Sequence, residues 1–139
     1  MDVPTKQAAP AQPISERLHF SLKVNSDRVA VEDSSGRWAI TYEQLSDQAD
    51  LFRETFSKVP ATPLVLNMQK SAPYYAAVTG CFVHGISFCP VDLVNPIERV
   101  AEIAAQFHGC VIVSDDAERH AALKACGLNS ILIDINGVI

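Results

Sequence analysis

Short apolar runs alternate with amphipathic segments along most of this chain, and this alternation limits the folds that the chain can adopt. The clearest apolar runs are Leu64–Met68, Cys110–Val113 and Ile131–Ile135. Runs this short, with few polar residues, are typical of strands that are buried on both faces. The segments between them carry apolar residues at helical spacing. Strands and helices in strict succession predict a three-layer α/β fold: a mostly parallel sheet, Rossmann-like in the loose sense, with helices on both faces.

Capping and turn residues set the boundaries of the predicted elements. After a first helix over residues 14–24, the segments 28–32 and 37–40 predict the two strands of a short hairpin. Thr41 and Gln44 form a capping box, which predicts the start of a long helix. The later elements are a strand over 64–68, a helix capped by Ser71 and ended by Gly85, a strand over 86–91, a helix opened by a second capping box at Asn95 and Glu98, a strand over 110–113, a helix over 115–126 capped by Ser114, and a strand over 131–135.

Length and composition favour one globular domain. The chain has 139 residues, of which 48% are hydrophobic and 19% are charged. A chain of this size can form a core without metal or disulfide crosslinks. Residues 1–13 contain no apolar run, so we expect a flexible tail there and a single α/β domain over residues 14–139.

The formal net charge of the chain is -5, whereas proteins that bind a phosphate backbone are usually basic. We therefore expect neither nucleic acid nor a membrane as partner. Polar residues, glycines and a proline also interrupt the longest apolar stretch, residues 74–94. Residues 1–13 do not resemble a secretory signal. The sequence thus predicts a cytoplasmic protein with buried free thiols, two disulfides in an oxidising compartment being the alternative; the cysteines are Cys81, Cys89, Cys110 and Cys126.

The common motifs for phosphate binding, metal binding and serine hydrolysis are missing from the sequence. It has no glycine-rich dinucleotide motif after a strand and no P-loop, so nothing predicts a phosphate cradle. The histidines lack cysteine or carboxylate neighbours at ligand spacing, except His120, whose acidic neighbours suit the first turn of a helix. No serine lies in a GxSxG motif. We therefore assign no catalytic, cofactor-binding or metal-binding residue.

Two pairs of residues allow both a functional and a structural interpretation. Asp115 and Asp116 follow a strand, as the Mg²⁺-binding carboxylates of phosphoacceptor domains do, but the other residues of such a site are missing. We favour the capping of the next helix. Tyr74 and Tyr75 could form the floor of a ligand pocket, but aromatic residues on a helix beside a sheet usually belong to the core. We expect these two in the core.

Two segments resemble core motifs of the adenylate-forming enzymes. Residues 40–45 (ITYEQL) resemble the first motif, a hydrophobic residue followed by Thr-Tyr-x-x-Leu. Residues 75–100 resemble the second motif, which combines an apolar helix, a glycine, a strand ending in Pro-x-Asp, and Pro-x-x-Arg. Residues 26–31 match the first strand of the family, so the resemblance covers about residues 14–134. The positions that match the second motif are Gly85, Phe88, Pro90, Val91, Asp92, Pro96, Glu98 and Arg99.

The resemblance implies the N-terminal subdomain of an adenylation domain. It is closest to the amino-acid-activating branch, which includes nonribosomal peptide synthetases and D-alanine ligases, although residues 84–86 and 93–95 depart from the usual pattern. Enzymes of this family convert a carboxylate and ATP into an acyl-adenylate, which is then transferred to a thiol. The family's phosphate loop, substrate pocket, ribose-binding Asp and catalytic Lys would follow Ile139. We therefore expect no catalysis by this chain alone, and ATP and Mg²⁺ only in a complete enzyme.

Three functions are compatible with the sequence. The first is a scaffold subdomain of a truncated adenylation enzyme, in which Asp92 secures the backbone at a strand end. The second is a free-standing interaction module. Because a second subdomain packs on this one in the complete family, we expect as partner the missing remainder of an adenylation domain, a homo-oligomer or a synthetase. The third is an unrelated doubly wound domain that binds a small molecule beyond the carboxyl ends of its strands, near Asp33, Met68, Asp92, Ser114 and Asp134.

Overall fold

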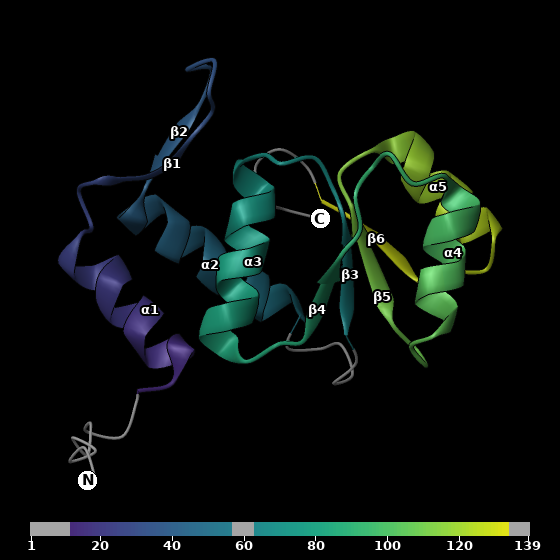
Figure 1. The fold of residues 1–139 in the computed structure, drawn as a ribbon, viewed down its shortest axis with the longest axis horizontal. Coiled ribbons are helices and arrows are strands. Elements are labelled where there is room, and N and C mark those ends of the chain that lie inside the picture. The colour runs from purple at the N-terminus through teal and green to yellow at the C-terminus, as the bar shows by residue number, and fades with distance from the viewer. Residues whose placement is uncertain (1–11, 57–62, 134–139) are drawn as a thin grey trace, which may run out of the picture.

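A parallel sheet lies between two helical layers, with a hairpin at one side (Figure 1). The computed structural model describes residues 12–56 and 63–133, so most of the predicted tail and all residues from Asp134 onward lie outside the described residues. The elements are, in chain order, α1 (Ile14–Val24), β1 (Val29–Glu32), β2 (Ala39–Thr41), α2 (Tyr42–Phe56), β3 (Leu64–Asn67), α3 (Ala72–His84), β4 (Phe88–Pro90), α4 (Ile97–Ala105), β5 (Val111–Ser114), α5 (Ala117–Ala125) and β6 (Ser130–Leu132).

The main sheet has four strands in the order β4-β3-β5-β6, and all neighbouring strands are parallel. Val65 of β3 lies opposite Cys89 of β4 and Ile112 of β5. Strands β3 and β5 occupy the centre, and every residue of both is buried. Burial on both faces explains why their sequences are nearly continuous apolar runs. The predicted α/β fold with a mostly parallel sheet is confirmed.

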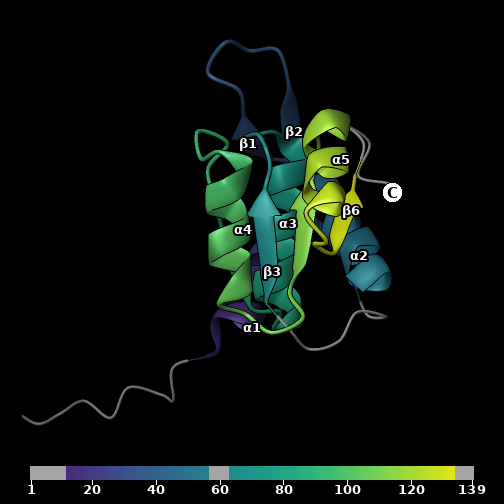
Figure 2. The ribbon, with the colours of Figure 1, turned by 90° about the vertical axis from the view of Figure 1, so that its right-hand side faces the viewer.

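Alternate residues of the central strands point into two separate cores. Leu64 of β3 belongs to one core together with Phe52 of α2. Val65, the next residue, belongs to the other core with Val100 of α4 and Leu123 of α5. Helices α2 and α3 therefore cover one face of the sheet, with α1 packed outside them, and α4 and α5 cover the other face, which Figure 2 views directly.

Strands β1 and β2 form an antiparallel sheet of their own, which confirms the predicted hairpin. The carboxylate of Asp33 closes its turn by accepting hydrogen bonds from the Ser35 hydroxyl and from Arg37 Nε, the latter at 3.1 Å. These two hydrogen bonds lower the pKa of Asp33. Trp38 packs beside Tyr75 of α3, with 6.4 Å between ring centroids, so the hairpin contacts the first helical layer.

Two of the predicted helix-end signals are present as expected. At the start of α2, the Gln44 N–H donates to Thr41 Oγ1 at 3.1 Å, and the Thr41 N–H donates to Gln44 Oε1 at 2.9 Å. This reciprocal pair is the predicted capping box. At the end of α3, Gly85 adopts a left-handed conformation with φ of 68°.

The predicted side-chain caps of α3 and α4 are wrong. Ser71 stands at the cap position of α3, but its hydroxyl donates to Gln69 O at 3.4 Å and makes no capping bond. Asn95 does not open α4, because its side-chain amide donates to Asp92 O at 3.0 Å and Pro96 is the N-cap. In both cases the side chain donates its hydrogen bond to a backbone carbonyl two or three residues earlier in the chain instead of capping the helix.

The predicted start of α5 is also wrong. The helix begins at Ala117, and Asp116 rather than Ser114 caps it. Asp116 Oδ1 accepts hydrogen bonds from the backbone N–H groups of Glu118 at 2.8 Å and Arg119 at 3.2 Å. Ser114 remains in β5 as its last residue. None of the helices in the described ranges is long and apolar enough to cross a membrane.

Candidate functional site

The order of the main sheet reverses between β3 and β5. From β3 the chain crosses to β4 on one side, and from β5 it crosses to β6 on the other. Doubly wound folds bind ligands at such a switch point, in the crevice beyond the carboxyl ends of the strands. Asn67 and Ser114 end the two strands there. The carboxyl edge between them is therefore the candidate site.

Arg119 of α5 reaches across this edge and contacts three acceptors. Its Nε donates to Asn67 Oδ1 at 2.8 Å, and its two terminal nitrogens donate to Asn95 O at 2.6 Å and Leu93 O at 3.4 Å. Asn67 is fully buried, and its Nδ2 donates to Val91 O at 2.9 Å. The network joins the end of β3, the loop after β4, and α5. Every nitrogen of the guanidinium is thus used by the chain itself.

Asp115 forms a second contact across the same edge. Its Oδ2 accepts a hydrogen bond from the Gln69 N–H at 3.2 Å, which joins the loop after β5 to the loop after β3. Its Oδ1 is buried and has no hydrogen-bond partner among the described residues. Burial raises the pKa of this carboxyl group, although the hydrogen bond from Gln69 opposes the shift. The capping role predicted for the acidic pair is confirmed for Asp116, whereas Asp115 holds the neighbouring loop.

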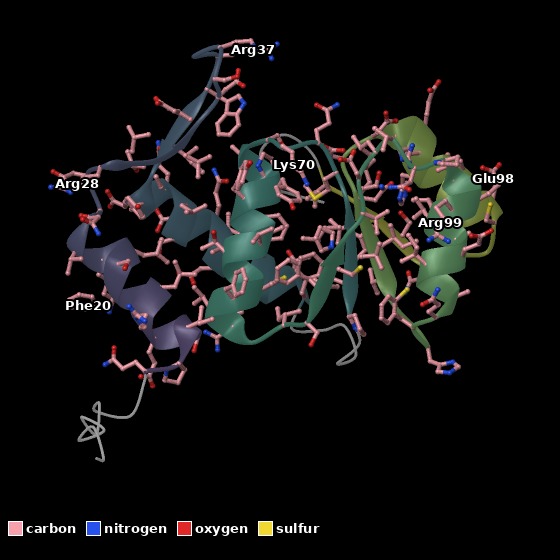
Figure 3. All side chains as sticks on the ribbon, viewed as in Figure 1. Phe20, Arg28, Arg37, Lys70, Glu98 and Arg99 are labelled. Carbon is pink, nitrogen blue, oxygen red and sulfur yellow. The ribbon has the colours of Figure 1, made fainter. Side chains whose placement is uncertain are left out.

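These contacts leave no cradle for a triphosphate at the switch point. The loops after β3, β4 and β5 contain no glycine. Lys70, which Figure 3 labels, lies in the first of these loops. Its Nζ is 4.1 Å from the centroid of the Tyr74 ring. Proteins usually bind ATP phosphates with glycine-rich backbone and with free cations. The residues that the structure describes therefore do not fit ATP by themselves.

The structure does not gather the residues that we named for a small-molecule pocket. Asp33 lies in the hairpin turn, outside the main sheet, so its placement at the carboxyl edge was wrong. Met68 and Ser114 do follow or end the central strands, but both side chains are buried. Asp92 lies in the loop after β4. Asp134 is outside the described residues.

The tyrosines and the family-like motif residues act locally. Tyr74 is buried in the core, as predicted, and meets Tyr75 edge to face at 5.2 Å between centroids. Asp92 Oδ1 accepts a hydrogen bond from the Val94 N–H at 3.2 Å, so it secures the backbone beyond β4. Arg99 is exposed and forms a 3.0 Å ion pair with Glu102, one turn further along α4. These residues shape turns and surfaces.

Two histidine contacts between elements were not predicted. His120 Nδ1 lies 2.9 Å from Ser130 Oγ, which links α5 to β6. His84 Nε2 lies 3.4 Å from Asp50 Oδ1, which links α3 to α2. Burial and the nearby Arg53 guanidinium lower the pKa of His84, while Asp50 opposes the shift. No sequence periodicity pairs residues on different elements.

Within the described ranges, no three His, Cys, Asp or Glu side chains are grouped so that they could hold a metal ion.

All four cysteines are free thiols. Burial raises the pKa of Cys81 to about 12, so its reactive thiolate is scarce at neutral pH. Cys110 is also buried and Cys89 is half-buried. Cys126 is exposed, which corrects the expectation of four buried thiols: it directly follows the last residue of α5 and lies beyond the helix face that packs on the sheet.

Solved adenylation domains match the fold over most of the chain. The nonribosomal peptide synthetase FmoA3, in a form bound to α-methyl-L-serine-AMP, matches over 91% of this chain and 14% of its own, with a TM-score of 0.73 and 25% identity. McyG A-PCP complexed with phenylalanyl-adenylate matches over 90% and 26%, with a TM-score of 0.73 and 16% identity. The N-terminal subdomain of Klebsiella oxytoca NpsA matches over 88% and 32%, with a TM-score of 0.71 and 16% identity.

Sequence comparison finds relatives of the same kind. The hybrid PKS-NRPS synthetase fsa1 of a Fusarium species is 26% identical over 105 residues, or 73% of this chain. The nonribosomal peptide synthetase fso1 of Omphalotus olearius is 24% identical over 129 residues, or 84% of this chain. The chain spans about 3% of the length of these curated relatives, and no family model matches it. The chain is therefore similar in fold to the N-terminal subdomain of an adenylation domain, and in sequence to nonribosomal peptide synthetases.

Proposed function

We propose that this chain acts as the N-terminal subdomain of an amino-acid- or acyl-activating adenylation domain, and that it serves there as scaffold. The observation that carries the proposal is the match to the fold of FmoA3 over 91% of the chain. The contacts at the switch point support the scaffold role. Arg119, Asn67 and Asp115 bind other parts of the same chain there, and the loops lack the glycines that a phosphate site needs.

The partner in this proposal is the remainder of an adenylation domain. That part would supply the residues that bind ATP, Mg²⁺ and the carboxylic acid substrate. The present chain would supply a preformed surface, because the Arg119 network and the Asp92 turn hold the loops of the carboxyl edge to the sheet. A preformed surface reduces the entropy that is lost when two parts of a protein associate.

The scaffold role is tested by measuring nucleotide chemistry of the chain alone. We expect no heat of binding when ATP and Mg²⁺ are titrated into the protein at millimolar concentration, and no exchange of pyrophosphate into ATP with any proteinogenic amino acid. A complete adenylation domain measured under the same conditions is the positive control. Exchange by this chain alone would overturn the scaffold role. Nucleotide binding without exchange would instead favour the small-molecule-binding domain.

The assignment as part of an adenylation domain is tested on the transcript. We expect the reading frame to continue beyond the codon for Ile139 into a segment rich in glycine, serine and threonine. A stop codon directly after Ile139 would contradict this assignment and would favour a free-standing interaction module. The two measurements are independent, because one examines the gene and the other the protein.

A further inference from the structure

The outer face of α1 carries apolar side chains that the fold does not bury. Helix α1 packs on the body through Leu18 and Leu22. On its opposite side, Phe20 is 65% exposed and Val24 is 58% exposed. Figure 3 shows Phe20 at the outer edge of the molecule, pointing away from α2 and α3. Residues four apart on a helix lie one above the other, so these two side chains form one stripe. Contact with another apolar surface would remove these side chains from water, which is favourable.

On one flank of this stripe the charges change sign along the helix, whereas the exposed Arg17 lies on the other flank, beside Val24. Glu16 lies in the first turn of α1 and Lys23 in the last turn. Both side chains are exposed, and neither forms an ion pair in the part of the chain that the structure describes. Seven residues correspond to about two turns, so the two charges lie on the same flank of the stripe. The helix thus has one acidic and one basic end on that flank.

We propose that the α1 face, defined by Glu16, Phe20, Lys23 and Val24, binds the α1 face of a second copy of this chain in antiparallel orientation. Alignment about Phe20 places each Phe20 against its counterpart and each Glu16 beside the other copy's Lys23. A parallel twofold pair would instead bring this flank against the flank of the other copy that carries Arg17, so Glu16 and Lys23 would not meet. The pattern is therefore self-complementary, as an interface with twofold symmetry requires.

The size of the face sets the strength of this association. A helix of 11 residues is about 16 Å long. It buries less than the ~800 Å² per partner that is typical of stable complexes. We therefore expect a reversible dimer that forms at high protein concentration. The proposal goes beyond the scaffold function and does not depend on it, because none of its residues lies at the carboxyl edge of the sheet.

Sedimentation of the full chain over a range of concentrations tests the dimer. We expect a reversible monomer–dimer equilibrium that Phe20→Ser abolishes. Val94→Ser is the matched control, because Val94 is 86% exposed but lies in the loop before α4, in the opposite layer. This control should leave the equilibrium unchanged. A chain that is monomeric at every concentration, or a dimer that Phe20→Ser does not weaken, would overturn the proposal.

Charge reversal tests the antiparallel orientation. Glu16→Lys and Lys23→Glu should each weaken the dimer several-fold, because each places like charges at both contacts. An equimolar mixture of the two variants should associate more strongly than either alone, because a mixed dimer restores opposite charges at both contacts. Each substitution also opposes the dipole of α1, but it does so equally alone and in the mixture, so the comparison isolates the contact between copies. A mixture no stronger than its components rejects the antiparallel pairing.

Discussion

Arg119 of α5 and Asn67 at the end of β3 are joined by a 2.8 Å hydrogen bond from Nε to Oδ1, across the carboxyl edge of the sheet. Asn67 is fully buried, and its other side-chain atom donates to Val91 O beyond β4. The buried amide thus has partners at both ends, which fixes its orientation. Three segments that are distant in the sequence are held as one surface. Such a surface suits a subdomain that another part of an enzyme packs against.

Replacing Arg119 by methionine should destabilise the protein strongly. The variant keeps most of the aliphatic stem but leaves the buried Asn67 Oδ1 without its donor. Loss of a charge-assisted hydrogen bond and of a buried partner should lower the free energy of unfolding by about 2–3 kcal/mol. Urea denaturation measures the effect. Arg99→Met is the control, because the exposed pair with Glu102 should contribute less than about 1 kcal/mol. Equal losses in both variants would contradict the importance of the Asn67 contact.

The hydroxyl groups of Thr41 and Ser71 should contribute differently to the stability of the protein, because only Thr41 caps its helix. Thr41→Ala should lower the free energy of unfolding by about 1 kcal/mol, because it removes the acceptor for the Gln44 N–H. Ser71→Ala should cost less than about 0.5 kcal/mol, because the Ser71 hydroxyl makes no capping bond. Thermal or urea unfolding of both variants decides the point. A larger loss for Ser71→Ala than for Thr41→Ala would show that the assignment of the two caps is reversed.

Helices α2 and α3 approach closely at Gly80. A Cβ atom at this position would lie 3.2 Å from Ala49 O and 3.5 Å from Phe52 Cβ. Alanine is the better helix former by about 1 kcal/mol, but separating two packed helices costs about 1–3 kcal/mol. We therefore expect Gly80→Ala to lower the free energy of unfolding. A more stable variant would show that the neighbouring backbone gives way at little cost. The change in urea midpoint measures which effect is larger.

The elements that the sequence predicted well have signals within one segment. The central strands are buried on both faces and are apolar except for their last residues, and the hairpin and the Thr41 box are set by neighbouring residues. The edge strand β4 is shorter than predicted and covers Phe88–Pro90, whereas β6 begins at Ser130 and the end of its predicted segment lies outside the described residues. Among the described strands, β4 has a neighbour on one side only, so fewer of its apolar residues are held in a ladder.

Less of the candidate site than of the fold could be predicted from the sequence. Arg119 and Asn67 are 52 positions apart, and no periodic pattern connects residues at that distance. The signal that could have found Asn67 is its own polarity, since it is a buried amide at the end of the apolar run LVLN. The caps at Ser71 and Asn95 were wrong for a related reason. Each side chain can also reach a nearby backbone carbonyl, and sequence alone does not rank the two partners.

The stability of the protein should depend on the protonation of His84. Burial and Arg53 lower its pKa below the ordinary value of 6.5. As the pH falls through 6.5, the unfolded chain therefore binds this proton before the folded chain does, and unfolding becomes more favourable. Stability should decline from about pH 7 downward and level off only below the lowered pKa of the folded state.

The variant His84→Gln isolates this effect. It removes the titrating group, so the free energy of unfolding should fall less steeply between about pH 7 and pH 5 than in the parent protein. Urea denaturation of the parent and the variant at a series of pH values gives both slopes. Slopes rather than absolute values are compared, because the substitution also changes the contact with Asp50. If His84→Gln retains the slope of the parent, the proton uptake on unfolding belongs to another group, and the burial of His84 at the junction of α2 and α3 does not limit stability in acid.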